Sequence, residues 1–435
     1  MVSAFVSGAV GVRFGAAPAH GAPAVCGQAR GAWSVGAAPR PATLWMPAAA
    51  PRSPTTVMKT ETETATEWVT CPGAELSPHH ADAKISADIS PVMAANNIER
   101  PMIIGVAADS GCGKSTFLRR VSGIFGTKVS QSHTPQGDFM TVICLDDFHT
   151  QDRKGRAAAK VTALDPAANN FELMYQMCKA LKEGKSVMKP IYNHETGEID
   201  PPELITPNHV IVVEGLHPMY DERMKELLDF TVYLDLSDEV KIAWKIQRDM
   251  AERGHTLDNI LASIESRRPD FEAYVDPQKR DADMVMQILP TNLIPDDTEK
   301  KVLRVRMLQK EDTAVDAVYL YDEGSTIDWV PCGKKLTCGY PGIKFHYGPD
   351  TYFDNEVSVL EVDGNFAKLE EMIYVETHLN NTSTKFYGEM TQQLLKNPNA
   401  PGSTNGTGLC QVLIALKMRE MYEKITGRKV LPVAA

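Results

Sequence analysis

Between residue 100 and about residue 236, short apolar segments alternate with stretches of helical periodicity. The apolar segments are residues 102–107, 141–145, 209–213 and 230–235, and residues 115–121 and 239–253 show helical periodicity. Apolar strands that alternate with helices are typical of a largely parallel sheet covered by helices on both faces. We therefore predict an α/β fold for a core that spans residues 100–300.

The pattern changes after residue 300. Residues 302–307 and 315–321 alternate apolar and polar side chains, which predicts antiparallel strands. Gly and Pro residues predict turns through residues 331–350, and residues 391–395 and 408–426 have a helical pattern. We expect residues 301–430 to form a smaller part of the same unit, with antiparallel strands and helices.

Residues 1–60 differ from the rest of the chain in composition. They are rich in Ala, Gly, Pro and Ser and contain five basic side chains but no Asp or Glu. This composition is typical of an organellar transit peptide, and a disordered extension that stays attached is the alternative. We interpret residues 61–99 as a polar lead-in, so we expect the folded body to begin near Arg100.

The net charge of the chain restricts which kinds of molecule it could bind. The chain carries a net charge of −11, and the +5 of residues 1–60 leaves −16 for residues 61–435. So acidic a body is a poor non-specific binder of nucleic acid, and phosphate ligands would need positive charge gathered locally. No apolar run is long enough to predict a membrane span. We therefore expect neither nucleic acid nor membrane as a partner.

A glycine-rich turn separates the first predicted strand from the helix after it. It contains Ala108, Asp109, Ser110, Gly111, Cys112, Gly113, Lys114, Ser115 and Thr116. Apart from Ala108 at the usual first glycine, this is the pattern whose backbone N–H groups surround phosphates, whose lysine neutralises them and whose serine binds Mg²⁺. The turn predicts binding of ATP with Mg²⁺, and a glycine-rich turn without a ligand is the alternative.

Acidic side chains follow the next two predicted strands. Asp146 and Asp147 come after residues 141–145, and Glu214 comes after residues 209–213. In open α/β sheets ligands bind outside the carboxyl ends of the strands. Phosphoryl transfer to an alcohol needs one carboxylate for the hydroxyl and others for Mg²⁺. An aspartate that caps the next turn is the alternative, and chemistry alone does not separate Asp146 from Asp147.

Several cationic and aromatic side chains could meet a phosphorylated substrate. His149 and Arg153 follow the acids, and Tyr192 and His194 lie in a turn-rich loop. A second group lies on the helix predicted from residue 239. Lys245, Asp249 and Arg253 are spaced four residues apart, which puts them on one face of that helix, and Arg248 lies beside them. The alternative for this face is a solvated, salt-bridged surface.

Longer strings carry a resemblance across most of the body. Residues 107–116, 143–149, 161–166, 213–223, 244–254 and 341–345 together resemble phosphoribulokinases of the plant and algal type. The resemblance implies a P-loop kinase fold and transfer of the ATP γ-phosphate to the 1-hydroxyl of D-ribulose 5-phosphate. Another P-loop small-molecule kinase, such as a uridine kinase, and an assembly protein that binds ATP without using it are the alternatives.

The resemblance also assigns roles to the candidate residues. It implies that Asp146 is the base, that Lys114 acts on the phosphates, and that Glu214 and Asp249 serve Mg²⁺ together with Ser115. The sugar phosphate would be met by His149, Arg153, Lys245, Arg248 and Arg253, with Tyr192 and His194 as further candidates for the sugar end.

Finally, the resemblance implies redox regulation in the plastid stroma, and a homodimer. It pairs Cys112 with Cys144 in a disulfide that thioredoxin reduces. It pairs Cys332 with Cys338 in a second regulatory disulfide, which in the family is connected with assembly with glyceraldehyde-3-phosphate dehydrogenase through a small disordered linker protein; without the resemblance, we would interpret these two as small hydrophobes. Independently, a thiol beside a helix N-terminus is expected to have a lowered pKa. The segment 125–140 looks shorter than in land-plant members, so the tether of the first bridge would be strained.

Overall fold

The computed structural model describes residues 66–127, 136–253, 256–294, 300, 302–321, 326–329 and 342–431, without the side chains of 247–249 and 251–253. The chain divides into Met1–Glu63 and Thr64–Ala435, and the described residues all belong to the second unit. Residues 1–60 with the transit-peptide prediction, Cys332 and Cys338, and residues 128–135 of the tether after Phe125 lie outside the described residues.

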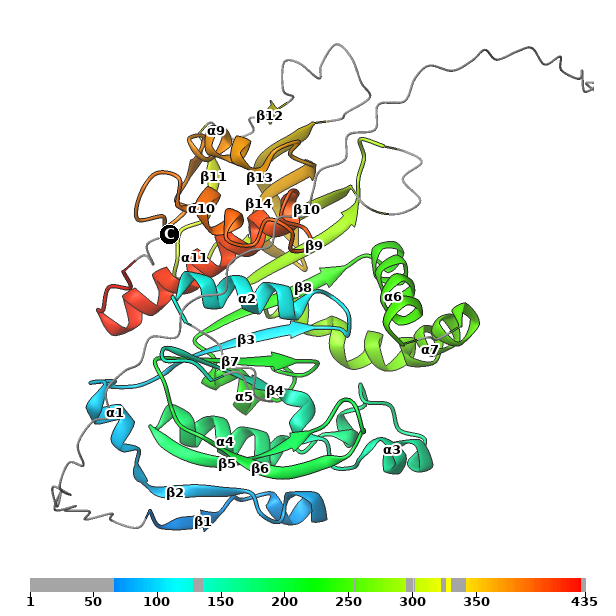
Figure 1. The fold of residues 1–435 in the computed structure, drawn as a ribbon, viewed down its shortest axis with the longest axis vertical. Coiled ribbons are helices and arrows are strands. Elements are labelled where there is room, and N and C mark those ends of the chain that lie inside the picture. Colours follow the sequence, from blue (N-terminus) through cyan, green and yellow to red (C-terminus); the bar gives the residue numbers. More distant parts are fainter. Residues whose placement is uncertain are drawn as a thin grey trace, which may run out of the picture. The chain divides into compact units, whose positions relative to one another are not determined.

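A nine-stranded sheet forms the centre of the second unit (Figure 1). Its order is β12-β13-β14-β10-β9-β8-β3-β7-β4. The strands are β3 (Met102–Ala108), β4 (Met140–Cys144), β7 (Val210–Gly215), β8 (Phe230–Leu236), β9 (Met284–Pro290), β10 (Leu303–Lys310), β12 (Thr326–Trp329), β13 (Ile343–Tyr352) and β14 (Asn355–Gly364). The five strands from β4 to β9 are parallel, and the pairs beyond β9 are antiparallel. The predicted α/β fold class is confirmed.

Strand β3 shows why the sheet is covered on both faces. All seven of its residues are buried. Because successive side chains alternate between faces, Ile104 and Val106 pack with α2 (Lys114–Ile124) and α11 (Gly406–Thr426). Ile103 faces the other way and packs with α4 (Phe171–Lys182) and α5 (Glu222–Leu227). An apolar run without alternation is therefore a central strand.

The region before Arg100 requires a correction. Residues 66–99, which we expected to be a polar lead-in, contain β1 (Trp68–Thr70), β2 (Lys84–Ile89) and the short helix α1 (Pro91–Ala95). Strands β1 and β2 join β5 (Lys185–Tyr192) and β6 (Ile199–Ile205) in a second, antiparallel sheet. The folded body therefore begins before residue 70. Most side chains of these first two strands are exposed, and β1 has only three residues, although Lys84–Ile89 does alternate polar and apolar residues as a strand would.

The C-terminal part extends the main sheet. The hairpin β13–β14 pairs through β14 with β10, in a region where turns were predicted up to residue 350. Residues 315–321 contain only the two-residue strand β11 (Tyr319–Leu320), which pairs with β15 (Leu379–Asn380). Among the described residues, the other helices are α3 (Arg153–Ala159), α6 (Asp238–Arg253), α7 (Leu257–Asp270), α9 (Met372–Glu376) and α10 (Glu389–Leu395).

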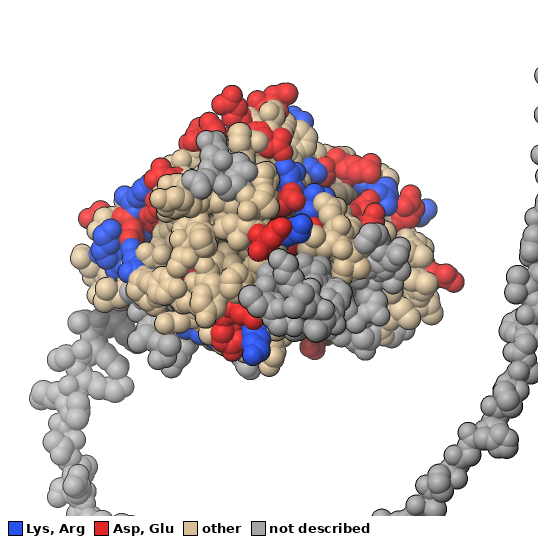
Figure 2. Space-filling model, turned by 90° about the horizontal axis from the view of Figure 1, so that it is seen from above, with Lys and Arg blue, Asp and Glu red and all other residues tan. Residues whose placement is uncertain are grey.

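The described surface is mixed in charge. On the face shown in Figure 2, acidic and basic side chains are interspersed, with wide uncharged areas between them. None of the described helices is both long enough and apolar enough to cross a membrane.

Candidate active site

The glycine-rich turn lies at the carboxyl end of β3, directly before α2. Gly111 and Gly113 have φ values of +89° and +81°, in the left-handed region that favours glycine. At Gly113 a Cβ would meet nothing closer than 4.0 Å, so its backbone conformation, and not crowding, requires glycine. Helix α2 begins at Lys114, and its first N–H groups have no partner within the helix. This is the geometry of a phosphate-binding turn.

Lys114 connects this turn with the acid on the neighbouring strand. Its Nζ lies 3.5 Å from Glu214 Oε2 and 3.4 Å from the Ala108 carbonyl oxygen. Burial opposes the charge of Lys114, but Glu214 and then Asp146 outweigh it and raise the pKa of the ammonium above its ordinary value. Lys114 is therefore a permanent cation at the place where phosphates would bind.

Strand pairing places the two predicted acids together. In the parallel register, Glu214 of β7 is level with Val106 of β3 and with Cys144 of β4. Asp146 follows Cys144 by two residues, on a 3-10 turn that spans Leu145–Phe148. Glu214 and Asp146 both act electrostatically on Lys114. The structure therefore gathers Lys114, Asp146 and Glu214 at one edge of the sheet.

Asp146 opens to solvent between two histidines. Its side chain is 30% exposed, with one carboxylate oxygen 3.7 Å from His149 Nε2 and the other 3.7 Å from His194 Nε2. Burial opposes its ionisation, but His149, Lys114 and further cationic groups hold the pKa of Asp146 below its ordinary value. Burial lowers the pKa of His149 to about 4, so near pH 7 this histidine is neutral and Lys114 is the stable cation beside Asp146. Asp146 is a carboxylate at neutral pH.

Asp147 has a different environment from its neighbour. It is buried, it accepts a hydrogen bond from Lys189 Nζ at 2.5 Å and another from the Tyr192 backbone N–H at 2.7 Å. Lys189 is only 1% exposed and also lies 3.3 Å from Glu203. Asp147 thus joins the 3-10 turn to β5. No local pattern could have predicted this role, because Lys189 lies far away in the sequence.

Tyr192 and Arg153 support the histidines from β5 and α3. Tyr192 is buried, with its ring edge-on to His149 and His194. Its hydroxyl accepts a hydrogen bond from Arg156 at 2.8 Å. Arg153 donates to the backbone carbonyl of His194 at 2.6 Å. His149 is fixed from its other side, since Nδ1 lies 2.9 Å from Asn169 Oδ1. Arg156 was a candidate for the sugar phosphate, and sequence reasoning missed that it holds Tyr192; it also missed Asn169 as a support of His149.

Of the four residues predicted on helix α6, the structure describes the side chain of Lys245. The side chains of Arg248, Asp249 and Arg253 lie outside them, so their predicted roles stay predictions. Lys245 lines a small pocket beside the phosphate-binding turn, together with Asp109, Lys241 and Arg267.

Two of these pocket residues contact the turn. Asp109 lies 3.1 Å from Lys241 Nζ and 3.9 Å from Arg267. Burial acts against ionisation of Asp109, but Lys241 and Arg267 outweigh it and lower its pKa. Helices α6 and α7 are thus tied to the turn by contacts that the sequence did not single out.

The two cysteines near the site are free thiols. Cys112 is 2% exposed, and burial raises its pKa to about 12 with help from Asp109. Burial also raises the pKa of Cys144, which Glu214 and Asp146 reinforce. The expectation that Cys112 has a lowered pKa is wrong for this conformation, because desolvation of the buried thiolate outweighs the opposing influence of Lys114 and Lys241.

Glu214 gives a test of whether the residues suit Mg²⁺. Its Oε2 is buried, and among the described residues it has no hydrogen-bond partner, only the ionic contact with Lys114. Ser115, in the first turn of α2, is exposed. Carboxylate and hydroxyl oxygens are the ligands that Mg²⁺ prefers. The donors fit a magnesium ion at this edge.

The chain is similar to several known proteins. Residues 103–295 match the model of the "Phosphoribulokinase / Uridine kinase family". "Phosphoribulokinase, chloroplastic" of Spinacia oleracea is 62% identical over 339 residues, which cover 76% of this chain and 84% of that protein. "Phosphoribulokinase" of the cyanobacterium Synechocystis is 63% identical over 338 residues, or 78% of this chain and 98% of that protein. A solved structure of phosphoribulokinase from Rhodobacter spheroides aligns with 73% of this chain and 99% of its own, at 14% identity and a TM-score of 0.40.

Proposed function

The chain belongs to the phosphoribulokinase / uridine kinase family, and we propose that it transfers the γ-phosphate of ATP to O1 of D-ribulose 5-phosphate. The products are ADP and D-ribulose 1,5-bisphosphate. The observation that supports this most directly is the meeting of Lys114, Asp146 and Glu214 where β3, β4 and β7 end. Phosphoryl transfer to an alcohol needs such a phosphate-binding cation and a nearby carboxylate.

Asp146 is the group that would take the proton of the attacking hydroxyl. It is ionised at neutral pH and 30% exposed, so a substrate can reach it. Neutral His149 and exposed His194 flank it and can hydrogen-bond the sugar hydroxyls. Lys114 and the N–H groups of the turn would hold the β- and γ-phosphates. Arg153 and Lys245, with Arg248 and Arg253, would bind the sugar phosphate.

Mg²⁺ would be held by Glu214 and Ser115, with Asp249 as a further candidate. A bound Mg²⁺ neutralises charge that develops on the transferred phosphoryl group. Glu214 then has two roles in this chain, since it also lies 3.5 Å from Lys114 and keeps that side chain charged and in place.

A uridine kinase is the main rival, because the matching family model includes both activities. The likeness to the spinach phosphoribulokinase covers 339 residues and so extends well outside the family match at residues 103–295. A coupled assay of ADP release with ribulose 5-phosphate and with uridine decides between them. We expect turnover with the sugar phosphate alone. Turnover with uridine alone would refute the proposal.

Redox regulation through a Cys112–Cys144 disulfide is supported by where the two thiols lie. Both border the site, since Cys112 lies in the turn after β3 and Cys144 ends β4. A disulfide needs Cα atoms within about 7 Å, so the bridge would hold the phosphate-binding turn against the end of β4, and any movement of the turn needed to reach that distance would disturb it. Holding or moving the turn in this way would remove the ATP site. Activity should therefore fall on oxidation, return with a dithiol, and stop responding in Cys112→Ser.

The remaining proposals concern where the chain acts in the cell and which proteins it binds. We propose a location in the plastid stroma with residues 1–60 as transit peptide, in line with the chloroplastic spinach relative. Thioredoxin would reduce the disulfide. A homodimer, and an assembly with glyceraldehyde-3-phosphate dehydrogenase through a linker protein at Cys332 and Cys338, complete the proposal. Light scattering on the purified chain tests the dimer, and import into isolated plastids tests the transit peptide.

A further inference from the structure

Three different metal-ligating groups, one of them the proposed base, come together at the end of β4. One ligand atom each of Cys144, Asp146 and His194 lies within 4.8 Å of the other two. The thiol ends β4, the carboxylate lies on the following 3-10 turn, and the imidazole lies in the loop after β5. Asp146 and His194 come within 3.7 Å of each other. Segments that are far apart in the sequence thus supply one cluster.

The chemistry of this cluster differs from that of a magnesium site. Mg²⁺ selects oxygen ligands and does not favour sulfur. A thiolate, an imidazole and a carboxylate are the ligand types that Zn²⁺ and similar borderline-soft ions prefer. In a tetrahedral site, bond lengths of about 2.0–2.3 Å place ligand atoms roughly 3.3–3.8 Å apart. The cluster needs only a small contraction, and the exposed His194 side chain is free of helix or strand constraints.

The surrounding charges favour a cation. Glu214, Asp146 and Asp147 all act on the Cys144 thiol as negative charges, and Lys114 acts in the opposite sense. The ammonium of Lys114 is itself compensated by Glu214 at 3.5 Å. His149 is held by Asn169 and lies 3.7 Å from the second Asp146 oxygen, so it can orient the carboxylate from outside the cluster.

An ion can also reach the cluster from solvent. The side chain of His194 is 63% exposed and that of Asp146 is 30% exposed. Cys144 is partly buried beneath them. The three ligands leave a fourth position for water, as in zinc sites with three protein ligands.

We propose that Cys144, Asp146 and His194 form an inhibitory site for a borderline-soft divalent cation, of which Zn²⁺ is the example. Binding replaces the thiol proton: the S–H bond breaks, a sulfur–zinc bond forms, and one proton is released to solvent. No oxidant or reductant takes part. The ion then occupies the carboxylate that would otherwise accept the proton of the sugar hydroxyl, so turnover stops. The inhibition rests on the proposed function, whereas the binding does not.

Binding is tested first, without turnover. Co²⁺ is titrated into the dithiol-reduced, nucleotide-free full chain, and thiolate-to-cobalt charge-transfer absorption and tetrahedral d–d bands are recorded. Zn²⁺ is then added to displace the cobalt. We expect both absorptions, and we expect Cys144→Ser to abolish the charge-transfer band. His194→Ala should weaken Zn²⁺ binding by at least about 10- to 100-fold, the range found for lesser changes around metal ligands.

Matched controls separate the site from general metal binding. His79→Ala removes an exposed histidine elsewhere, and Cys178→Ala removes a buried thiol next to α4 core residues; both should bind Zn²⁺ like the unmodified chain. A charge-transfer band that survives in Cys144→Ser would overturn the proposal, as would unchanged Zn²⁺ affinity in His194→Ala. His194→Ala changes an exposed side chain, so loss of folding does not obscure its result.

Inhibition is tested second. Zn²⁺ should inhibit the reduced enzyme in excess Mg²⁺, a chelator should restore activity, and the inhibition constant should rise in His194→Ala by the same factor as the dissociation constant. If Zn²⁺ binds but the chain has no activity with ribulose 5-phosphate, the proposed function fails and the site stands. If Zn²⁺ binds at the cluster and does not inhibit, the inhibitory role fails.

Discussion

The main sheet has one edge where its parallel strands begin and another where they end, and charged side chains are paired differently at the two edges. At the edge where β3 and β8 begin, Asp229 accepts hydrogen bonds from the Arg100 guanidinium at 2.9 and 3.2 Å and from the Ile103 N–H at 2.8 Å, with Lys182 at 3.4 Å. At the opposite edge, the contacts of Asp146 are 3.7 Å long, and Glu214 Oε2 has no hydrogen-bond partner among the described residues. At the first edge, the charged and polar groups are hydrogen-bonded to one another within the fold. At the second edge, carboxylate oxygens remain available to ligands.

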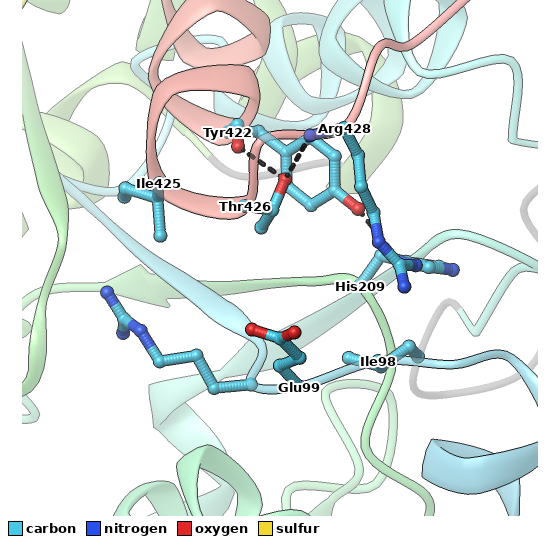
Figure 3. A pocket seen from close by; sticks show the side chains of 8 residues that line it. Ile98, Glu99, His209, Tyr422, Ile425, Thr426 and Arg428 are labelled. Carbon is cyan, nitrogen blue, oxygen red and sulfur yellow. Dashed lines mark hydrogen bonds between the residues drawn. The ribbon is translucent and has the colours of Figure 1, made fainter.

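Figure 3 shows a pocket at the first edge, where polar side chains from distant segments hydrogen-bond to one another. The Tyr422 hydroxyl of α11 lies 2.9 Å from His209 Nδ1, just before β7. Phe139 stacks on His209 with ring centroids 4.4 Å apart. Arg428 donates to the backbone carbonyls of residues 96 and 97. These polar groups fasten the C-terminal helix to the beginning of the sheet, so their main contribution is to stability.

The largest expected difference between the edges is in turnover. Asp146→Asn removes the proposed proton acceptor and keeps the size of the side chain. We expect kcat to fall by about 10²–10⁴-fold, the usual contribution of a general base, while ATP still binds. Steady-state assays and a nucleotide titration measure the two effects. If kcat stays near that of the unmodified chain, Asp146 is not the base, and a protein that binds ATP without using it becomes the better interpretation.

Asp147→Asn tests whether neighbouring aspartates have separate roles. It leaves the buried Lys189 with Glu203 as its remaining acidic partner, and breaking a buried ion pair costs about 3 kcal/mol or more. We expect this loss in the free energy of unfolding, measured by urea denaturation. The double variant Asp147→Leu with Lys189→Met removes both charges and should recover part of the loss. A stable Asp147→Asn with greatly reduced kcat would reverse the two assignments.

Asp229→Asn probes the first edge. It weakens charge-assisted hydrogen bonds to Arg100 and Ile103, so we expect a loss of about 2 kcal/mol in unfolding free energy. Because this aspartate lies at the opposite edge from Lys114 and Asp146, kcat should not change under conditions where the variant is folded. A large fall in kcat of the folded variant would contradict the division between the edges.

The smallest effect concerns pH. Burial lowers the pKa of His149 from 6.5 to about 4, so between these values the unfolded chain binds more protons than the folded chain. Stability that is present above pH 6.5 is therefore lost as the pH falls towards 4. From this histidine we expect a loss of roughly 1–2 kcal/mol between pH 7 and pH 5.

The measurement compares the unmodified chain with His149→Gln. His80 and His217 have pKa values lowered to about 4 by burial as well, so the variant should keep part of the slope seen in the unmodified chain. Unfolding curves at several pH values give the slope for each chain. Equal slopes would show that His149 is solvated, and not neutral and buried beside Asp146.

Much of the site could be predicted because its signals are local. Two glycines with positive φ fix the phosphate-binding turn between β3 and α2. The apolar strands β4 and β7 place Asp146 and Glu214 at their carboxyl ends, as predicted. The first strands, β1 and β2, escaped prediction because β1 is only three residues long and most side chains of both strands are exposed, although β2 alternates polar and apolar residues. Pairing of β1 with β2 and of β2 with β5 holds them in the second sheet.

The sequence by itself determined the α/β class, the phosphate-binding turn and the acids that follow the strands, since glycine conformation and side-chain alternation act over a few residues. Side-chain chemistry left the two aspartates open and the family resemblance pointed to Asp146; only the tertiary structure shows how their environments differ, because Lys189 reaches Asp147 from β5. The tertiary structure also reversed the expected pKa shift of Cys112, because desolvation depends on everything packed around the thiol and not on its neighbours in sequence. Burial and partner choice are properties of the folded chain, and they separate residues that look alike in the sequence.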